Sequence, residues 1–308
     1  MQLKNIDLIT ILGPTASGKT SFAAHLAHHF KGEIISADSR QVYRGMTIGT
    51  GKDYKDYDIE ETHIPFHLVD IADAGYKYNV FEFQKDFLKI YKDIEERNVL
   101  PILCGGSGMY IEAITNGYTL IQVPNNPGLR KKLEKLSMNE LVTMLASYKR
   151  LHNTTDIDNR KRVLRALEIE VFYNEHSDRL LDFPDIKTVF IGIKFDRPSQ
   201  RRRITERLNQ RLHEGMVDEV ELLLKHLTPE QLTYYGLEYK YITKYIIEEF
   251  SYQEMVKKLE TAIHQFAKRQ MTWFRKMERN GAKIHWLDGH MSMEEKMNRA
   301  LSILSNYS

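Results

Sequence analysis

The first third of the chain alternates short apolar runs with amphipathic segments, a pattern typical of strands connected by helices in a parallel sheet. Three apolar runs predict strands at Leu8–Leu12, Glu33–Ser36 and residues 99–104. Between the last two, apolar side chains recur at helical spacing over residues 79–97. An asparagine followed three residues later by a glutamate predicts a capping box at the start of that helix. The pattern therefore predicts an α/β core.

The pattern changes near residue 120. From there to residue 186, the segments that follow a turn cluster of prolines, asparagines and a glycine are typical of helices. Residues 188–195 return to a strand pattern, and beyond Pro198 the chain is predicted to be almost wholly helical, with breaks at Gly215, Pro229 and Gly236. We therefore predict a core of residues 1–119 and 188–308, a helical insertion domain at residues 120–187, and a helical C-terminal part.

Composition excludes several classes of protein. The 308 residues are 42% hydrophobic and 28% charged, which is ordinary for one large globular domain or two modest ones. The single cysteine, Cys104, excludes an intramolecular disulfide and a multi-cysteine zinc module. No apolar run is long enough for a membrane span or a signal peptide, so we expect a cytoplasmic protein without membrane association. The net charge of +2 gives no indication of a nucleic-acid partner, and a monomer is the default expectation.

The strongest local motif follows the first predicted strand and opens a helix. It has the pattern G-x-x-x-x-G-K-[ST] and comprises Gly13, Pro14, Thr15, Ala16, Ser17, Gly18, Lys19 and Thr20. The backbone N–H groups of such a loop form an anion nest at the positive end of the following helix. Lys19 adds a cation for phosphate oxygens, and the Thr20 hydroxyl can hold Mg²⁺. The motif makes the predicted core P-loop NTPase-like and predicts a phosphorylated ligand.

The acidic residue expected in a nucleotide-hydrolysing protein is missing from its usual position, and another acidic residue lies elsewhere. The run at residues 99–104 ends in Cys104, followed by glycines and a serine, rather than in an acid. Asp38 instead follows the second predicted strand, at the sheet edge where α/β proteins bind ligands. There Asp38 could coordinate Mg²⁺, accept a proton from a nucleophile, or only cap a turn, and spacing alone leaves these alternatives open.

Five sequence blocks together resemble one family. They are GPTASGKT (13–20), ISADSRQVYRGMTIGTGK (35–52), GGSGMYIEAITNG (105–117), DNRKRVLRALEI (158–169) and FAKRQMTWFRK (266–276). In this order they resemble the tRNA dimethylallyltransferases, from the N-terminus to about residue 286. The resemblance implies a P-loop-type α/β core with a helical insertion. It also implies transfer of a dimethylallyl group from dimethylallyl diphosphate to N6 of the adenosine adjacent to the tRNA anticodon, at position 37, with release of diphosphate.

The resemblance also implies roles for individual residues. The loop at residues 13–20 would hold the donor diphosphate, with Mg²⁺ on Thr20 and with Thr15 near the leaving oxygen. Asp38 matches the family's general base toward the adenine amino group. Contacts with tRNA are implied for Asp38, Ser39, Arg40, Gln41 and Ser107, the last standing where the family usually has threonine. No site is carried over to residues 235–240, where Glu238 departs from the family pattern.

Basic residues are concentrated in three stretches despite the small net charge. In residues 197–211, three arginines share one helical face, and the resemblance implies that Arg203 clamps the donor diphosphate through bidentate contacts as a catalytic residue. The second stretch matches a family tRNA-contact block and carries Lys161, Arg162 and Arg165. The third, residues 268–276, brackets Trp273 and Phe274, whose rings either contact unstacked bases or pack in the core.

Two other classes of function stay open. An adenylate isopentenyltransferase acting on free AMP would share the loop and Asp38, but it would need neither the insertion nor three basic stretches. A P-loop kinase or nucleotide-driven RNA-binding switch would bind ATP tightly and release its γ-phosphate, which the missing acid after residues 99–104 disfavours. The resemblance, together with these arguments against the alternatives, implies Mg²⁺-assisted prenyl transfer to the anticodon stem-loop of tRNA.

Overall fold

The computed structural model describes residues 5–118, 120, 122–149, 157–175 and 183–307. The chain divides into two compact units. The larger comprises Met1–Gly117 and Asp185–Ser308, and the smaller comprises Tyr118–Pro184, in the part of the chain where the sequence predicts an insertion. Among the described residues, no helix is long and apolar enough to cross a membrane.

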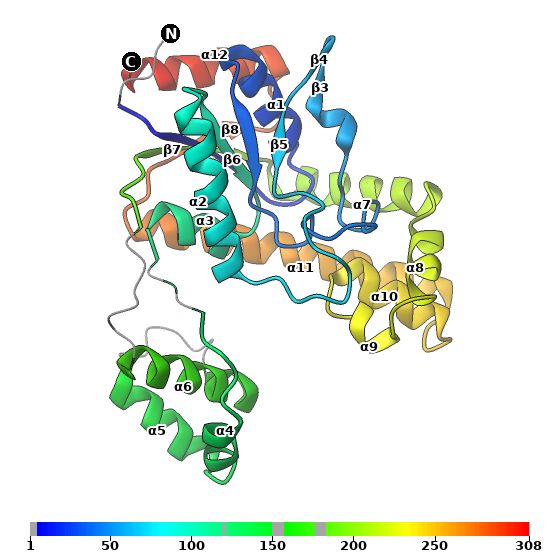
Figure 1. Cartoon of the computed structure of the whole chain (residues 1–308). Coiled ribbons are helices and arrows are strands. Elements are labelled where there is room, and N and C mark those ends of the chain that lie inside the picture. The colour runs from blue at the N-terminus through cyan, green and yellow to red at the C-terminus, as the bar shows by residue number, and fades with distance from the viewer. Residues whose placement is uncertain (1–4, 119, 121, 150–156, 176–182, 308) are drawn as a thin grey trace. The chain divides into compact units, whose positions relative to one another are not determined.

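A six-stranded parallel sheet forms the centre of the larger unit (Figure 1). Its strands lie in the order β5 (Phe66–His67), β2 (Glu33–Ser36), β6 (Pro101–Gly105), β1 (Leu8–Leu12), β7 (Thr188–Lys194) and β8 (Ile284–Asp288). The central strands β2, β6 and β1 are buried along their whole length, as expected for a parallel sheet that is covered on both faces. A separate hairpin pairs β3 (Asp58–Ile59) with β4 (Thr62–His63).

Helices cover both faces of the sheet. On one face, α1 (Lys19–Phe30) and α12 (Met293–Leu304) share a hydrophobic cluster with Ile9 and Ile11 of β1. Because side chains alternate along a strand, Leu8 and Leu12 point to the opposite face. There α2 (Val80–Glu96) and α3 (Gly108–Thr115) contact β6. This arrangement leaves the carboxyl edge of the sheet as the place where loops gather.

The rest of the larger unit's C-terminal part is mostly helical. It contains α7 (Arg197–His213), α8 (Met216–Leu224), α9 (Pro229–Leu232), α10 (Leu237–Ile246) and the 28-residue α11 (Tyr252–Arg279), which contacts α3, α7 and α10. Short 3-10 turns occur at Tyr54–Tyr57 and Ser305–Tyr307. These helices bring residues from the end of the chain to loops near its beginning.

Most of the predicted element boundaries are confirmed, as is the predicted α/β class with a parallel sheet. β1 and β2 have the predicted bounds, and α2 follows Asn79, whose side chain caps it in the predicted capping box. The predicted breaks are also present, because Gly215 and Gly236 precede α8 and α10 and Pro229 begins α9.

The chain beyond Pro198 is mostly helical, as predicted, but it also contains a strand that the sequence pattern does not predict. β8 pairs in parallel with β7 at the edge of the sheet. Its five residues, Ile-His-Trp-Leu-Asp, do not alternate strictly between apolar and polar side chains. Two of them are half-buried and one is exposed. Its strand conformation depends on pairing with a segment far away in sequence, which local pattern does not reveal.

The smaller unit has its own apolar core. Its helices are α4 (Pro127–Leu133), α5 (Met138–Tyr148) and α6 (Arg160–Glu175), and they bury a leucine-rich cluster. Glu168 is also buried, and its carboxylate pairs with Arg130 at 2.8 Å and with Arg165 at 3.4 Å. A buried carboxylate needs such partners, so these two arginines stabilise the unit.

Two phenylalanines on α11 provide a matched test of this packing. Phe274 is fully buried and lies beside the ring of Trp286 in β8, whereas Phe266 is 38% exposed. Phe274→Ala should lower the free energy of unfolding by about 3–5 kcal/mol, because it removes buried apolar area and leaves a cavity. Phe266→Ala should lower it by about 0.5 kcal/mol or less. Urea unfolding of both variants measures the difference, and equal losses would contradict the packing described.

Candidate active site at the carboxyl edge of the sheet

The loop after β1 has the conformation of an anion nest. Ala16 and Gly18 have φ values of 60° and 80°, so the chain turns tightly before α1 begins at Lys19. Close packing requires glycine at position 13, because a Cβ there would lie 2.7 Å from the carbonyl oxygen of Ile193. The loop therefore presents its backbone amides at the positive end of α1, which is a favourable place for an anion.

Two side chains of this loop indicate a ligand with oxygen acceptors. Burial lowers the pKa of the Lys19 ammonium, while the negative charge of Asp38 acts in the opposite direction. A desolvated cation is stabilised by a bound anion. The hydroxyl of Ser17 is buried and has no hydrogen-bond partner among the described residues, and Ser17 lines the same cleft as Lys19 and Thr20.

The loops after β2 and β6 meet beside the phosphate loop, because β6 lies between β2 and β1 in the sheet. Asp38 follows β2, and its Oδ1 accepts a hydrogen bond from the backbone N–H of Arg40 at 2.9 Å. Ser107 follows β6, and its hydroxyl accepts from the backbone N–H of Ser39 at 3.1 Å. The first bond fixes the orientation of the Asp38 carboxylate, and the second ties its loop to the loop after β6.

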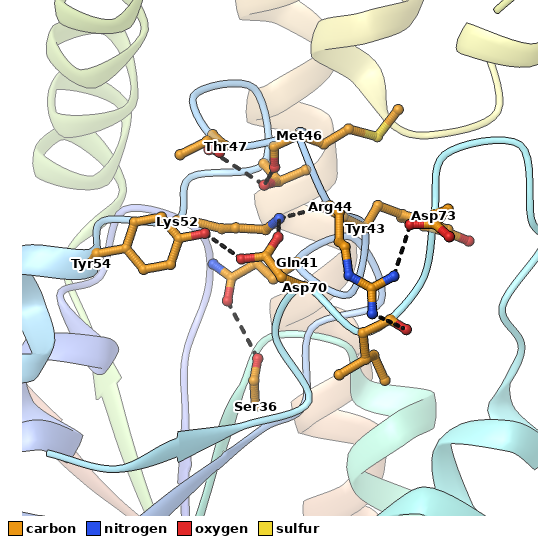
Figure 2. Close-up of polar contacts among 12 residues, drawn as sticks. Ser36, Gln41, Tyr43, Arg44, Met46, Thr47, Lys52, Tyr54, Asp70 and Asp73 are labelled. Atoms are coloured by element: carbon orange, nitrogen blue, oxygen red, sulfur yellow. Dashed lines mark hydrogen bonds and ion pairs between the residues drawn. The ribbon is translucent and has the colours of Figure 1, made fainter. Parts of the chain in front are cut away.

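A buried polar network supports the segment that follows Asp38 (Figure 2). The ammonium of Lys52 is buried, and it donates to the carbonyl oxygen of Tyr43 and to Asp70. The other carboxylate oxygen of Asp70 accepts from the hydroxyl of Tyr54. Burial lowers the pKa of Lys52, whereas the Asp70 carboxylate raises it. A buried cation with two oxygen partners closes residues 43–54 into a fixed loop.

Gln41 connects that loop to the sheet. Its Nε2 donates to the carbonyl oxygen of Gly51 at 3.0 Å. Figure 2 shows its other bond, in which Oε1 accepts from the hydroxyl of Ser36 in β2 at 3.3 Å. Both ends of its amide are therefore engaged within the protein.

Glu219 of α8 holds the same loop from the opposite side. Its carboxylate accepts the backbone N–H groups of Thr47, Ile48 and Gly49 at 2.7–3.0 Å, and also the hydroxyl of Tyr239 at 2.7 Å. Four donors on one carboxylate compensate for its partial burial. The C-terminal helices are thereby fastened to the loop next to Asp38.

The arginines of α7 lie on the far side of the phosphate loop. Arg203 donates from Nε to the carbonyl oxygen of Ala16 at 3.0 Å, and its guanidinium lies over the ring of Phe195. Arg207 and Arg211 both pair with Asp53, at 2.7 Å and 3.3 Å. Burial lowers the pKa of Arg211. One guanidinium therefore lies at the phosphate loop and the other two at Asp53, and all three arginines line the cleft.

These groups line a single cleft of about 990 Å³ in the larger unit. Besides the arginines, the predicted residues that line it are Thr15, Ala16, Ser17, Gly18, Lys19, Thr20, Asp38, Ser39, Arg40, Gln41 and Ser107. The other two predicted loop residues, Gly13 and Pro14, do not line the cleft but connect β1 to the lining residues that begin at Thr15. The two rings of the third basic stretch have different places, because Trp273 lines the cleft and Phe274 is in the core.

Three predicted tRNA-contact residues belong to the smaller unit and are not among the residues that line this cleft. Lys161 is exposed, and Arg162 pairs with Asp158 at 2.6 Å on the surface. Arg165 binds Glu168 and also donates to the carbonyl oxygen of Val123 at 2.9 Å. This structural role is one that the basic pattern alone does not indicate.

Several residues that support the cleft are not predicted from the sequence. Gln270 lines the cleft, whereas Lys52 and Glu219 lie behind the lining, and each of the three fixes a loop through hydrogen bonds. Gln270 carries the clearest signal, because it is a polar residue in line with the buried face of α11, between Ala267 and Phe274. A buried polar side chain on an amphipathic helix requires partners, and the motif loops are where those partners lie.

A glycine-rich loop between a buried strand and a helix, with a lysine and a threonine at its end, defines a phosphate-binding α/β protein. Comparison with known families narrows this class. The model of the IPP transferase family matches residues 41–277, and the model of the isopentenyl transferases matches residues 6–70. The chain belongs to the IPP transferase family.

Similarity to individual relatives extends over the whole chain. It is 56% identical to tRNA dimethylallyltransferase 1 of Parabacteroides distasonis, over 99% of both chains. It is also 56% identical to tRNA dimethylallyltransferase 2 of Bacteroides fragilis, over 97% of both. Among solved structures it is similar to the tRNA isopentenylpyrophosphate transferase of Bacillus halodurans, with 31% identity, a TM-score of 0.71, and coverage of 97% and 96% of the two chains.

Glu219 provides a test of how the cleft is held together. Glu219→Gln should lower the free energy of unfolding by about 2–3 kcal/mol, because an amide nitrogen replaces one acceptor facing buried N–H groups. Glu221→Gln, on the exposed side of the same helix, should change it by about 0.5 kcal/mol or less. Urea unfolding compares the two variants, and a Glu219→Gln variant as stable as the Glu221→Gln control would contradict the role given to this carboxylate.

Proposed function

We propose that this protein transfers a dimethylallyl group from dimethylallyl diphosphate to N6 of adenosine 37, adjacent to the anticodon of tRNA, and releases diphosphate. The observation that carries the proposal is that the phosphate loop and the Asp38 carboxylate line one cleft from neighbouring loops. A leaving group and a nucleophile can therefore be held next to each other. The family to which the chain belongs and the names of its full-length relatives support the same reaction.

The phosphate loop binds the diphosphate of the donor. Its backbone amides, the Lys19 ammonium and the Arg203 guanidinium face the charge that grows on the leaving oxygen as the carbon–oxygen bond breaks. Thr15 lines the cleft in the same loop, and we propose that its hydroxyl donates to the bridging oxygen. Interactions that strengthen as this charge develops lower the barrier to transfer.

Asp38 acts on the other substrate. An exocyclic adenine amine is a poor nucleophile, so a carboxylate that orients it and accepts its proton assists formation of the new bond between nitrogen and carbon. In the balanced step, the N6–C1 bond forms, the C1–O bond breaks, diphosphate leaves, and the N6 proton passes to Asp38. The Arg40 amide bonded to Oδ1 holds the carboxylate in place for this transfer.

Magnesium fits the donor set of the cleft. The Thr20 hydroxyl lies at the start of α1, and the oxygens of Thr20 and Asp38 are hard ligands of the kind that Mg²⁺ prefers. Among the described residues, no group of three or more histidines, cysteines or carboxylates could hold a metal without a substrate. Thr20 would therefore hold the ion together with diphosphate oxygens and water. When bound, magnesium supplies positive charge that stabilises the leaving diphosphate.

Cations and aromatic rings at the cleft suit an RNA loop. Arg40 and Lys77 lie over the ring of Tyr234, at 5.3 Å and 5.6 Å from its centroid, and Tyr234 is 40% exposed. Lys276 lies 4.9 Å from the ring of Trp273. Rings stack on unstacked bases, and cations bind the phosphates between them. The target adenine must leave its stack to reach Asp38, so the base is flipped out on binding.

The smaller unit carries its own proposed RNA-contact residues. Lys161 and Arg162 are exposed on the first turn of α6. We infer that these two side chains bind RNA phosphates, with Arg162 exchanging its surface pair with Asp158, and such contacts carry affinity without sequence information. A free nucleotide acceptor would need no such contacts, which favours tRNA over AMP.

The direct test is transfer of labelled dimethylallyl diphosphate by the purified protein. Label should appear at adenosine 37 of an anticodon stem-loop RNA, and Asp38→Asn should lower kcat by about 10²–10⁴-fold because it removes the proton acceptor. Affinity of this variant for the RNA, measured by filter binding, should stay within about threefold of the wild type. Asp58→Asn, at an exposed hairpin position, is the control and should leave kcat unchanged.

Other outcomes distinguish the alternatives. Transfer to free AMP as efficient as transfer to RNA would favour an adenylate isopentenyltransferase. Release of γ-phosphate from ATP without transfer of label would favour a kinase-like or nucleotide-driven activity. A large loss of RNA binding in Asp38→Asn would give this residue a recognition role instead of a role as base.

Magnesium dependence provides an independent check on Thr20. Chelation of divalent cations should abolish transfer, and added Mg²⁺ should restore it. Thr20→Val should raise the Mg²⁺ concentration for half-maximal activity by about tenfold or more, whereas Thr20→Ser, which keeps the hydroxyl, should stay near the wild type. A valine variant with an unchanged Mg²⁺ titration would remove Thr20 from the metal site.

A further inference from the structure

Gln270 connects two loops of the cleft through a single side chain. It lies on α11 and is only 7% exposed. Its Oε1 accepts from the backbone N–H of Thr15 at 2.8 Å, and its Nε2 donates to the carbonyl oxygen of Gly106 at 3.0 Å. One amide therefore joins the phosphate loop after β1 to the loop after β6.

The connection continues to the general base. Gly106 precedes Ser107, whose hydroxyl accepts from the backbone N–H of Ser39, the residue after Asp38. A hydrogen-bonded path thus runs from Thr15 through Gln270 and the Gly106–Ser107 peptide to the segment that carries Asp38. Its two ends are the loop that holds the leaving group and the carboxylate that takes the proton.

Glutamine suits the chemistry of the path. The Thr15 amide needs an acceptor and the Gly106 carbonyl needs a donor, and the glutamine amide supplies them from two separate atoms, Oε1 and Nε2. The two partners also fix which way round the amide is oriented. Glycine at position 106 leaves room for this amide, because a Cβ there would lie 2.4 Å from the Gln270 Nε2 and displace it.

We propose that Gln270 is a positioning residue that sets the separation of the diphosphate loop from Asp38. This inference rests on the proposed function, because it assigns the two linked loops to the two substrates. Each loop keeps its own binding contacts without Gln270, whereas their mutual alignment does not persist. Because the rate of a reaction between bound groups falls steeply with small displacements, loss of the link affects kcat more than binding.

A matched glutamine elsewhere separates positioning from stability. Gln84 on α2 is 2% exposed, and its Nε2 donates to the carbonyl oxygen of Ala113 at 2.8 Å, outside the lining of the cleft. Gln270→Met and Gln84→Met each replace a buried amide with an apolar side chain of similar length. Any general cost of losing a buried hydrogen bond is therefore shared by both variants.

The test compares kcat, both KM values and the midpoint of thermal unfolding for these two variants. Gln270→Met should lower kcat by about 10–100-fold. KM for tRNA and the affinity for inorganic diphosphate should stay within about threefold of the wild type. Gln84→Met should lose similar thermal stability and keep the wild-type kcat. If Gln270→Met does not fold, Gln270→Glu and Gln84→Glu replace the pair, since glutamate keeps the acceptor for Thr15 and loses the donor for Gly106.

Two results would overturn the proposal. If kcat of the Gln270 variant matches that of the Gln84 variant, Gln270 only stabilises the fold. If kcat is unchanged and only KM for one substrate rises, Gln270 supports one binding loop and does not align the two. Failure of the wild-type protein to transfer label would instead refute the proposed function, so the two failures are distinguishable.

Discussion

The parallel pairing of β6 with both β1 and β2 is the constraint on which the rest of the cleft depends. Leu12 of β1 lies beside Gly105 of β6, and Ser36 of β2 lies beside Cys104. All three strands therefore end at one edge, and the loops that follow them must be neighbours. The phosphate loop, Asp38 and Ser107 come together because of this register, although they are separated widely in the sequence.

The C-terminal helices then hold these loops in place. Arg203 of α7, Glu219 of α8 and Gln270 of α11 each bind backbone groups of a loop from the first third of the chain. Backbone groups at the end of a buried sheet must find partners, and side chains from distant helices supply them here. The same helices place arginines around the phosphate loop, so loop support and charge come from one part of the structure.

Local sequence features predict the parts of this site that depend on local chemistry. The phosphate loop has a fixed spacing, and a strand precedes it and a helix follows it, so Lys19 and Thr20 could be assigned directly. Asp38 could be placed at the sheet edge because it follows an apolar run. The role proposed for Asp38 as general base rests on resemblance to a family, since position alone also fits a turn or a metal ligand.

The features that could not be predicted depend on contacts between distant segments. β8 forms only against β7, Lys52 is buried only when Asp70 lies next to it, and Gln270 has its partners only once α11 crosses the loops. The net charge gave no indication of a nucleic-acid partner for a related reason. The net charge of +2 averages over the whole chain, whereas the fold directs Arg203, Arg207 and Arg211 to one cleft. A basic pattern also does not separate Lys161 on the surface from Arg165, which neutralises buried Glu168.

The central claim is that donor and acceptor meet between the phosphate loop and Asp38. A crystal structure of the protein with an anticodon stem-loop RNA and a donor analogue, in which sulfur replaces the bridging oxygen, tests it most directly. The account predicts diphosphate oxygens on the backbone amides of residues 13–20 and the N6 of a flipped adenine within about 3 Å of the Asp38 carboxylate. Diphosphate bound elsewhere, or an adenine amine out of hydrogen-bond reach of Asp38, would contradict it.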